Sequence, residues 1–339
     1  MPVDMKWTHV LRNTWCVEGR VCIPVYLLND REAVLLDTGY AEDRQQLDAL
    51  LREKGLQVRA VLGSHSHNDH SGNHAYYQQQ GAEIILQNLE AAIVSDAALL
   101  AAAYWPATVR EVTRELSHLL IQADRTFTAA DSGLEIDGQH FGLLPLPGHT
   151  PGHTGIMTPD QVLYVGDAIL SSDVLRGARL PSTMDWAQDL ASKHRLEEVS
   201  CKAYLLAHNG IYTDLRPLIQ ENIDDKLRRA QEILEWIRER DSWKQHEVME
   251  LLWQRLGLRS RSFFNQIIFR RNAVCAMEYL AGTGALSNWM EGGERFYRAL
   301  CGSGGIPGQQ SGSPPAPGRS GQNALGFRQR KCPRQAPEA

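Results

Sequence analysis

Short apolar runs separated by turn residues dominate the N-terminal part of the chain. Runs rich in valine, leucine and isoleucine predict strands over residues 21–28, 32–37, 58–63, 82–87, 162–165 and 203–206. Two hairpins are expected as well, one around the Asp137-Gly138 turn and one within residues 155–169. Apolar residues at helical spacing predict helices over residues 41–54, 89–123 and 187–199. Strands mixed with helices, without a long parallel β-α-β series, indicate a layered α/β sandwich.

The pattern changes near residue 215, where long helical periodicity begins. Apolar residues recur at helical spacing and predict an amphipathic helix over residues 217–239. Short helices are expected over residues 246–257, 262–271 and 272–284, followed by a hairpin around Gly292-Gly293. Helices followed by a small hairpin resemble a winged-helix module.

Gly, Ser, Pro, Gln and Arg dominate the sequence from residue 301 onward. Such a segment has too few large apolar residues to offset the entropy lost on ordering. The predicted organisation is therefore an α/β domain over residues 1–214, a mainly helical module over residues 215–300 and a disordered tail over residues 301–339.

Composition narrows the possible partners. The chain has 43% hydrophobic and 22% charged residues, which is ordinary for a soluble globular protein. No apolar run has the length of a membrane span, and the N-terminus lacks the apolar segment of a secretory signal, so we expect a cytoplasmic protein without membrane contact. The net charge of −5 argues against nucleic acid as a partner. The six cysteines form no C-x-x-C pair and are expected to be reduced.

The segment SHSHNDHSGNH carries a dense set of metal-binding side chains. His65, His67, Asp69 and His70 lie within six residues, directly after a predicted strand. Imidazole and carboxylate groups are good ligands for borderline metal ions. The segment therefore predicts a metal site at a strand end.

Three more candidate ligands follow later strands in the same way. They are His149 in LPGHTPGHTG, Asp167 in LYVGDA and His208 in YLLAHNG. Strand ends at one edge of a sandwich can converge on one site. Five histidines and two aspartates are too many for one tetrahedral ion, and they suit two metal ions that share a carboxylate.

These motifs resemble those of the metallo-β-lactamase superfamily. HSHNDH matches the superfamily's H-x-H-x-D-H motif, and LLDTG, GHTPGHT, VGD and AHNG match its flanking motifs in the same order, over residues 21–212. The resemblance implies an αββα sandwich with the metal ions at one edge of the two sheets.

The resemblance also implies a role for each candidate ligand. One ion would be held by His65, His67 and His149, and the second by Asp69, His70 and His208. Asp167 would bridge both ions, which we expect to be zinc, with iron or manganese as alternatives. Asp37 and His153 would support the ligands without binding metal themselves.

The resemblance is strongest to the glyoxalase II-like branch and implies hydrolysis of a small-molecule thioester or ester. A hydroxide between two divalent cations would be the nucleophile, and Asp69 would orient it. Lactone hydrolysis, cleavage of single-stranded RNA and, outside hydrolases, an iron-dependent persulfide dioxygenase are the alternatives. The run AHNG differs from the G-H-E-Y-T-like run of glyoxalase II, which favours a more general hydrolase of that branch. The sequence leaves the oligomeric state open.

The remaining histidines are expected to lie outside the metal site. His74 is predicted to face solvent, and a structural or exposed role is expected for His9, His118, His140, His194 and His246. Two helical segments, residues 89–123 and 217–280, are expected to wall the site. Aromatic side chains that would contribute to this wall are Tyr104, Trp105, Trp236, Phe263 and Phe264.

Overall fold

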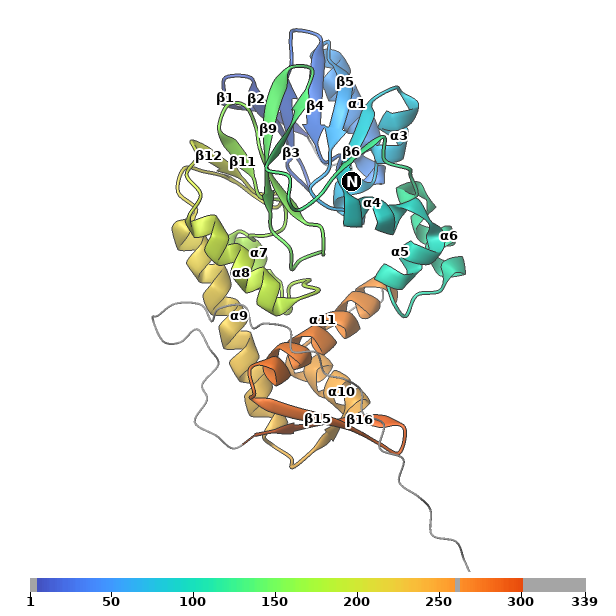
Figure 1. Ribbon diagram of the computed structural model, residues 1–339, viewed down its shortest axis with the longest axis vertical. Coiled ribbons are helices and arrows are strands. Elements are labelled where there is room, and N and C mark those ends of the chain that lie inside the picture. The colour runs from blue at the N-terminus through green and yellow to red at the C-terminus, as the bar shows by residue number, and fades with distance from the viewer. Residues whose placement is uncertain (1–4, 260–262, 301–339) are drawn as a thin grey trace, which may run out of the picture.

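The computed structural model describes residues 5–259 and 263–300, which form two facing sheets, a shell of helices and a C-terminal module (Figure 1). The first sheet has seven strands in chain order, antiparallel from β1 to β4 and parallel from β4 to β7. Its strands are β1 Lys6–Leu11, β2 Thr14–Glu18, β3 Ile23–Leu27, β4 Glu32–Leu36, β5 Gln57–Leu62, β6 Glu83–Gln87 and β7 Arg125–Phe127. The predicted tail, residues 301–339, lies outside the described residues.

The second sheet has six strands in the order β13-β12-β11-β10-β9-β8. All its neighbours are antiparallel except β11 and β12. The strands are β8 Gly133–Ile136, β9 Gln139–Pro145, β10 Thr154–Met157, β11 Val162–Tyr164, β12 Ala203–Leu205 and β13 Ile211–Tyr212. Both hairpins predicted from the sequence are confirmed, because β8 pairs with β9 across Asp137-Gly138 and β10 pairs with β11.

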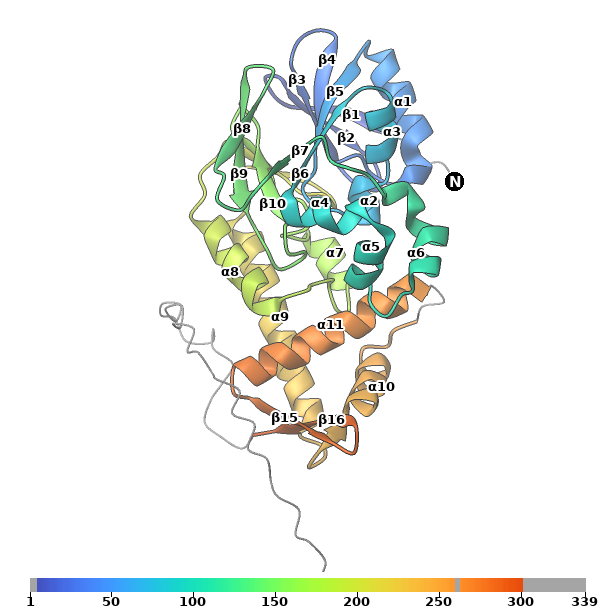
Figure 2. The same ribbon diagram turned by 45° about the vertical axis from the view of Figure 1, so that its right-hand side comes forward.

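Helices cover the outer face of each sheet. The first sheet is covered by α1 Arg44–Glu53, α3 His74–Gln79, α4 Asn88–Ser95, α5 Ala97–Ala103 and α6 Val109–Leu116. The second sheet is covered by α8 Trp186–Glu197 and α9 Arg216–Ile237, and α7 Ser172–Gly177 packs on α9. Apolar side chains of both sheets, including Leu36, Phe141 and Leu205, form the core between them. The predicted αββα sandwich is thus confirmed (Figure 2).

The C-terminal module follows α9 with β14 Trp243–Lys244, α10 Gln245–Arg255, α11 Phe263–Gly282, β15 Leu286–Glu291 and β16 Glu294–Ala299. Its small sheet has the order β14-β16-β15, and the predicted terminal hairpin is β15 and β16. The elements follow one another as helix, strand, two helices and hairpin, and the winged-helix assignment of this module stays a prediction. One apolar cluster contains residues of the second sheet, α9 and the module, so tight packing crosses the predicted boundary at residue 215.

The prediction of two short helices over residues 262–271 and 272–284 is wrong. One continuous helix, α11, spans most of this segment. No Gly or Pro interrupts it before Gly282. The Asn272 side chain accepts a hydrogen bond from Thr183 N and donates to the carbonyls of Leu180 and Pro181, so it does not compete for the backbone of its own helix. No described helix combines the length and apolar character needed to span a membrane.

His74 is buried, so the prediction that it faces solvent is wrong. The Asn73 side chain donates hydrogen bonds to Thr38 O and Tyr40 O, which folds the start of α3 onto the first sheet. His74 then packs beneath Gly63, and neither ring nitrogen has a partner among the described residues. Burial lowers the pKa of His74 to about 4.

Because the pKa of His74 is lower in the folded protein than in the unfolded chain, folding stability is expected to fall as the pH drops from about 6.5 towards 4. One such proton contributes a slope of at most ~1.4 kcal/mol per pH unit. His74→Phe, which cannot titrate, is expected to flatten this slope in urea unfolding measured across that range. His194→Phe, at an exposed position, should keep the wild-type slope. If the free energy of unfolding of His74→Phe and of wild type changed with pH in the same way, the lowered pKa of His74 would be contradicted.

Candidate metal centre

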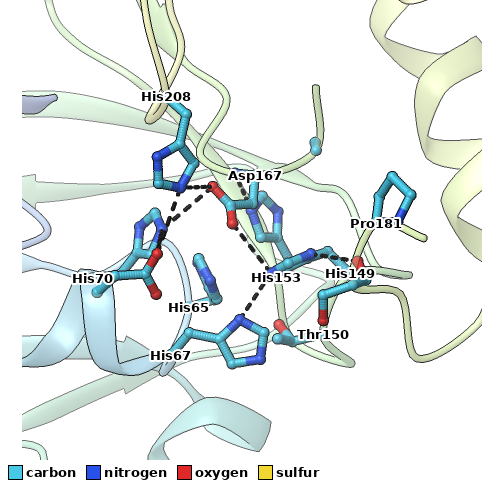
Figure 3. A network of polar contacts seen from close by, with 12 residues as sticks. His65, His67, His70, His149, Thr150, His153, Asp167, Pro181 and His208 are labelled. Atoms are coloured by element: carbon cyan, nitrogen blue, oxygen red, sulfur yellow. Dashed lines mark hydrogen bonds and ion pairs between the residues drawn. The ribbon is translucent and has the colours of Figure 1, made fainter. Parts of the chain in front are cut away.

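The seven candidate ligands lie together at one edge of the sandwich, where strands of both sheets end (Figure 3). His65 and His67 follow β5, and Asp69 and His70 belong to the short helix α2 Asn68–Ser71. The other three ligands follow β9, β11 and β12 of the second sheet, and they are His149, Asp167 and His208. The first sheet therefore supplies one half of the site and the second sheet the other half.

The ligand atoms form two groups. In the first group, atoms of His65, His67 and His149 lie within 4.8 Å of one another, and His149 Nε2 is 2.8 Å from His67 Nδ1. The second group contains Asp69, His70, Asp167 and His208. The resemblance assigned the same residues to two ions, and the structure groups Asp167 with the second set; their role as metal ligands stays a prediction.

Asp167 faces both groups. Its Oδ2 is 3.4 Å from His149 Nε2, and its Oδ1 is 3.3 Å from His70 Nε2 and 3.4 Å from His208 Nε2. His208 Nε2 is also 3.4 Å from Asp69 Oδ2. A carboxylate between two groups of imidazoles is the arrangement expected of a ligand shared by two cations.

Asp37, at the end of β4, anchors the second group without belonging to it. Its Oδ2 is 2.7 Å from His70 Nδ1 and accepts hydrogen bonds from Ser64 Oγ at 2.6 Å and Tyr164 OH at 2.8 Å. Its Oδ1 accepts from Ser64 N at 2.7 Å. Because Nδ1 of His70 is held by Asp37, Nε2 is the nitrogen left for a metal ion. Asp37 therefore contacts the His70 nitrogen opposite the one that faces Asp167, and its supporting role stays a prediction.

His153 holds the backbone of Asp167, the residue that faces both ligand groups. Its Nε2 accepts a hydrogen bond of 3.1 Å from Asp167 N, and burial, together with His149, lowers its pKa to about 3. The neutral ring can therefore act as the acceptor. Gly166 has a φ of +52°, and a Cβ there would come within 2.7 Å of His153 Nε2. Only glycine fits this turn without displacing His153.

Glu90 of α4 is a supporting residue that the sequence analysis missed. Its Oε2 accepts from Ser66 N at 2.9 Å and Ser66 Oγ at 2.5 Å. Its Oε1 accepts from Thr150 Oγ1 at 2.6 Å and Gly152 N at 2.8 Å. One buried carboxylate therefore joins the two loops that carry His65, His67 and His149. The only sequence signal is an acidic residue within an otherwise apolar helical turn.

Charge and burial make the site suitable for cations. Burial lowers the pKa of His65, His67 and His149, which keeps these rings neutral and able to bind a metal ion. Burial opposes protonation of His70, but the carboxylates of Asp167 and Asp69 raise its pKa well above the ordinary value. A divalent cation would take the place of that proton.

Unpaired atoms test whether the residues fit a metal ion. Three buried ligand atoms have no hydrogen-bond partner within the described part of the chain: His65 Nε2, His70 Nε2 and Asp167 Oδ1. Buried polar atoms normally have partners. Their position in the two ligand groups, together with the donor types, fits divalent cations such as zinc.

The remaining sequence-predicted residues lie elsewhere. His9, His140, His194 and His246 are exposed, and His118 Nε2 lies 2.6 Å from Asn68 Oδ1, so the expectation that these five lie outside the ligand groups is confirmed. Among the aromatic residues, Tyr104 approaches the His67 ring at 6.4 Å. Trp105 is 73% exposed and Trp236 packs in the C-terminal cluster. The side chains of Phe263 and Phe264 lie outside the described part of the structure.

The fold and the two ligand groups define a class of metal-dependent hydrolases. Residues 23–208, more than half of the chain, match the sequence model of the metallo-beta-lactamase superfamily, and the protein belongs to that superfamily. A metallo-beta-lactamase family protein from Thermus thermophilus has the same fold, with a TM-score of 0.63 and 23% identity over 88% of this chain and 98% of that one.

Curated relatives are similar to part of the sequence. The chain is 30% identical over 158 residues to a hydroxyacylglutathione hydrolase of Vibrio cholerae, which is 47% of each protein. It is 28% identical over 153 residues to hydroxyacylglutathione hydrolase GloC of Haemophilus influenzae, covering 44% of this chain and 66% of that one. The chain thus spans about half the length of the first of these relatives.

Removing the Asp37 carboxylate is expected to weaken metal binding, because His70 would lose the partner that orients its ring. Loss of such a supporting carboxylate typically costs about 10–100-fold in metal affinity. A competitive chelator titration of Asp37→Ala measures the effect. Asp48→Ala is the control: it removes a carboxylate that accepts hydrogen bonds from Tyr76 OH and Tyr77 OH, and it should keep the wild-type metal affinity. Equal affinities for both variants would show that Asp37 has no supporting role.

Proposed function

We propose that the protein is a dinuclear metal-dependent hydrolase that cleaves a thioester or ester of a small molecule. The observation that carries this proposal is the position of Asp167, whose two oxygens face the two ligand groups separately. His65, His67 and His149 would hold one cation, and Asp69, His70 and His208 the second, with Asp167 shared. When bound, the two cations would supply an activated water at neutral pH and a Lewis acid for the carbonyl oxygen.

The substrate would approach from the side of Asp69 and His208. Their side chains are 22% and 21% exposed, whereas those of His70 and Asp37 are fully buried. The Asp69 carboxylate can therefore accept a hydrogen bond from the attacking water and orient it. Burial opposes ionisation of Asp69, but His70 and His208 lower its pKa to about 2, so it is an acceptor at neutral pH.

Hydrolysis would proceed by addition of the water oxygen to the carbonyl carbon. The bond from that carbon to sulfur, or to oxygen in an ester, then breaks. The acid keeps the new oxygen, and the thiol or alcohol leaves with a proton. The names of the Vibrio and Haemophilus relatives support a thioester as the first substrate class to test. The net charge of −5 favours a small molecule over nucleic acid.

A hydrolysis screen of the metal-loaded protein tests the proposal. Thioesters are expected to be cleaved faster than lactones, a phosphodiester or single-stranded RNA, and a chelator should abolish the activity. Oxygen uptake on a persulfide, accompanied by bound iron, would identify a dioxygenase instead.

Asp167→Ala is expected to lower the metal content of both ligand groups and to reduce kcat/KM by at least ~100-fold, because the shared ligand is lost. Elemental analysis and steady-state kinetics measure the two effects. His140→Ala changes an exposed histidine and is the matched control. Full metal content in Asp167→Ala would refute the shared carboxylate.

Thiol alkylation is expected to leave turnover largely unchanged. The described cysteines, Cys16, Cys22, Cys201 and Cys275, form no disulfide with one another. A hydrogen bond with Cys16 and burial raise the pKa of the Cys22 thiol, and burial raises those of Cys201 and Cys275. Nucleophilic cysteines have lowered pKa values instead. Inactivation by iodoacetamide without loss of metal would point to a thiol mechanism.

A further inference from the structure

A cavity of about 190 Å³ lies beside the candidate metal centre. Its wall includes His149, Asp167 and His208 and continues over residues of α7, α8 and α9. Pro181, another wall residue, lies next to His149 (Figure 3). The cavity is large enough for several water molecules. It suits a short acyl chain whose carbonyl group lies at the metal ligands.

A buried charge cluster forms part of this wall. Lys193 Nζ donates to both oxygens of Asp189, at 2.8 and 2.7 Å, and to Ala168 O at 2.9 Å, so its three donors have partners. Lys226 Nζ is 2.7 Å from Asp189 Oδ2 and donates to Thr183 Oγ1 at 2.9 Å. The third donor of Lys226 has no acceptor among the described residues. The Lys226 side chain is only 8% exposed.

Further wall residues also have unsatisfied donors. Trp186 Nε1, Arg229 Nε and Ser182 Oγ are buried and make no hydrogen bond within the residues that the structure describes. The first two atoms can only donate. Apart from the metal ligands, the wall carries three cationic side chains and two carboxylates, so its formal charge is positive by one. A bound anion would accept hydrogen bonds from the unpaired donors and balance the positive charge of the buried wall.

We propose that this cavity binds an acyl group whose far end carries a carboxylate, and that Lys226 binds this carboxylate. The inference deepens the proposed function, because it names the class of acyl group that the hydrolase would accept. One net positive charge and one spare ammonium donor match a monoanion better than a phosphate dianion. The apolar side chains of Leu170 and Leu175, with the Trp186 ring 4.9 Å from Lys226 Nζ, would contact the methylene groups between the two ends.

The test compares succinate with butyrate, which has the same chain length but one carboxylate, by isothermal titration calorimetry on the full-length metal-loaded protein. Either ligand can place one carboxylate at the metal ions. The second carboxylate of succinate should therefore tighten binding at least tenfold over butyrate. Equal affinities for the two ligands would overturn the proposal, and tighter binding of 3-phosphonopropionate than of succinate would overturn the choice of a carboxylate.

Three variants locate the effect. Lys226→Met should abolish the preference for succinate, Lys226→Arg should retain most of it, and Lys202→Met, at an exposed lysine, should leave it unchanged. A persistent preference in a folded Lys226→Met protein would refute the role of Lys226. If Lys226→Met does not fold, Trp186→Phe decides the question. It keeps an aromatic ring against the methylene groups but removes the unpaired Nε1 donor, so it should weaken succinate binding severalfold more than butyrate binding.

Kinetics separate this inference from the proposed function. With succinyl and butyryl thioesters of the same thiol, Lys226→Met should raise KM for the succinyl substrate alone and leave kcat unchanged. Equal KM changes for both substrates would contradict recognition of the distal carboxylate. A succinate preference in binding, without hydrolysis of any thioester or ester, would support the cavity assignment and refute the proposed function.

Discussion

A single buried carboxylate, that of Asp37, couples the two sheets to the ligand loops. It takes hydrogen bonds from Ser64 after β5 and from Tyr164 at the end of β11, and it contacts His70 of the ligand motif. A buried carboxylate is costly unless its oxygens are paired. The spacing of the sheets and the conformation of the H-x-H-x-D-H loop therefore depend on each other. The metal centre belongs to the sandwich core instead of being an addition to a surface loop.

Sequence patterns predicted the features that local residues determine. Strands such as β4 and β5 are apolar on both faces because they lie between a helical layer and the other sheet. The ligands were found because each follows such a strand within a few residues. β1 and β2 were not predicted, because both mix polar with apolar residues and β1 is the edge strand of the sheet.

Features that depend on packing between distant segments were not predictable in this way. Glu90 joins one loop that lies 24 residues before it to another that lies 60 residues after it. Lys226 meets Asp189 only because α9 packs on α8. Helical spacing placed each residue on its element but gave no information about its partner. His74 was misassigned for the same reason, because only the fold of α3 onto the first sheet buries it.

Helix α11 connects both halves of the molecule. Ile267, near its start, packs in the apolar cluster beneath the first sheet, whereas Met277 and Leu280 pack in the cluster beneath the second sheet. Arg271, between them, donates to the carbonyl of Ala103 at the end of α5. Loss of this helix would expose apolar surface on both halves at once. Because this packing joins the sandwich to the module, the two parts are expected to unfold in a single transition and not domain by domain.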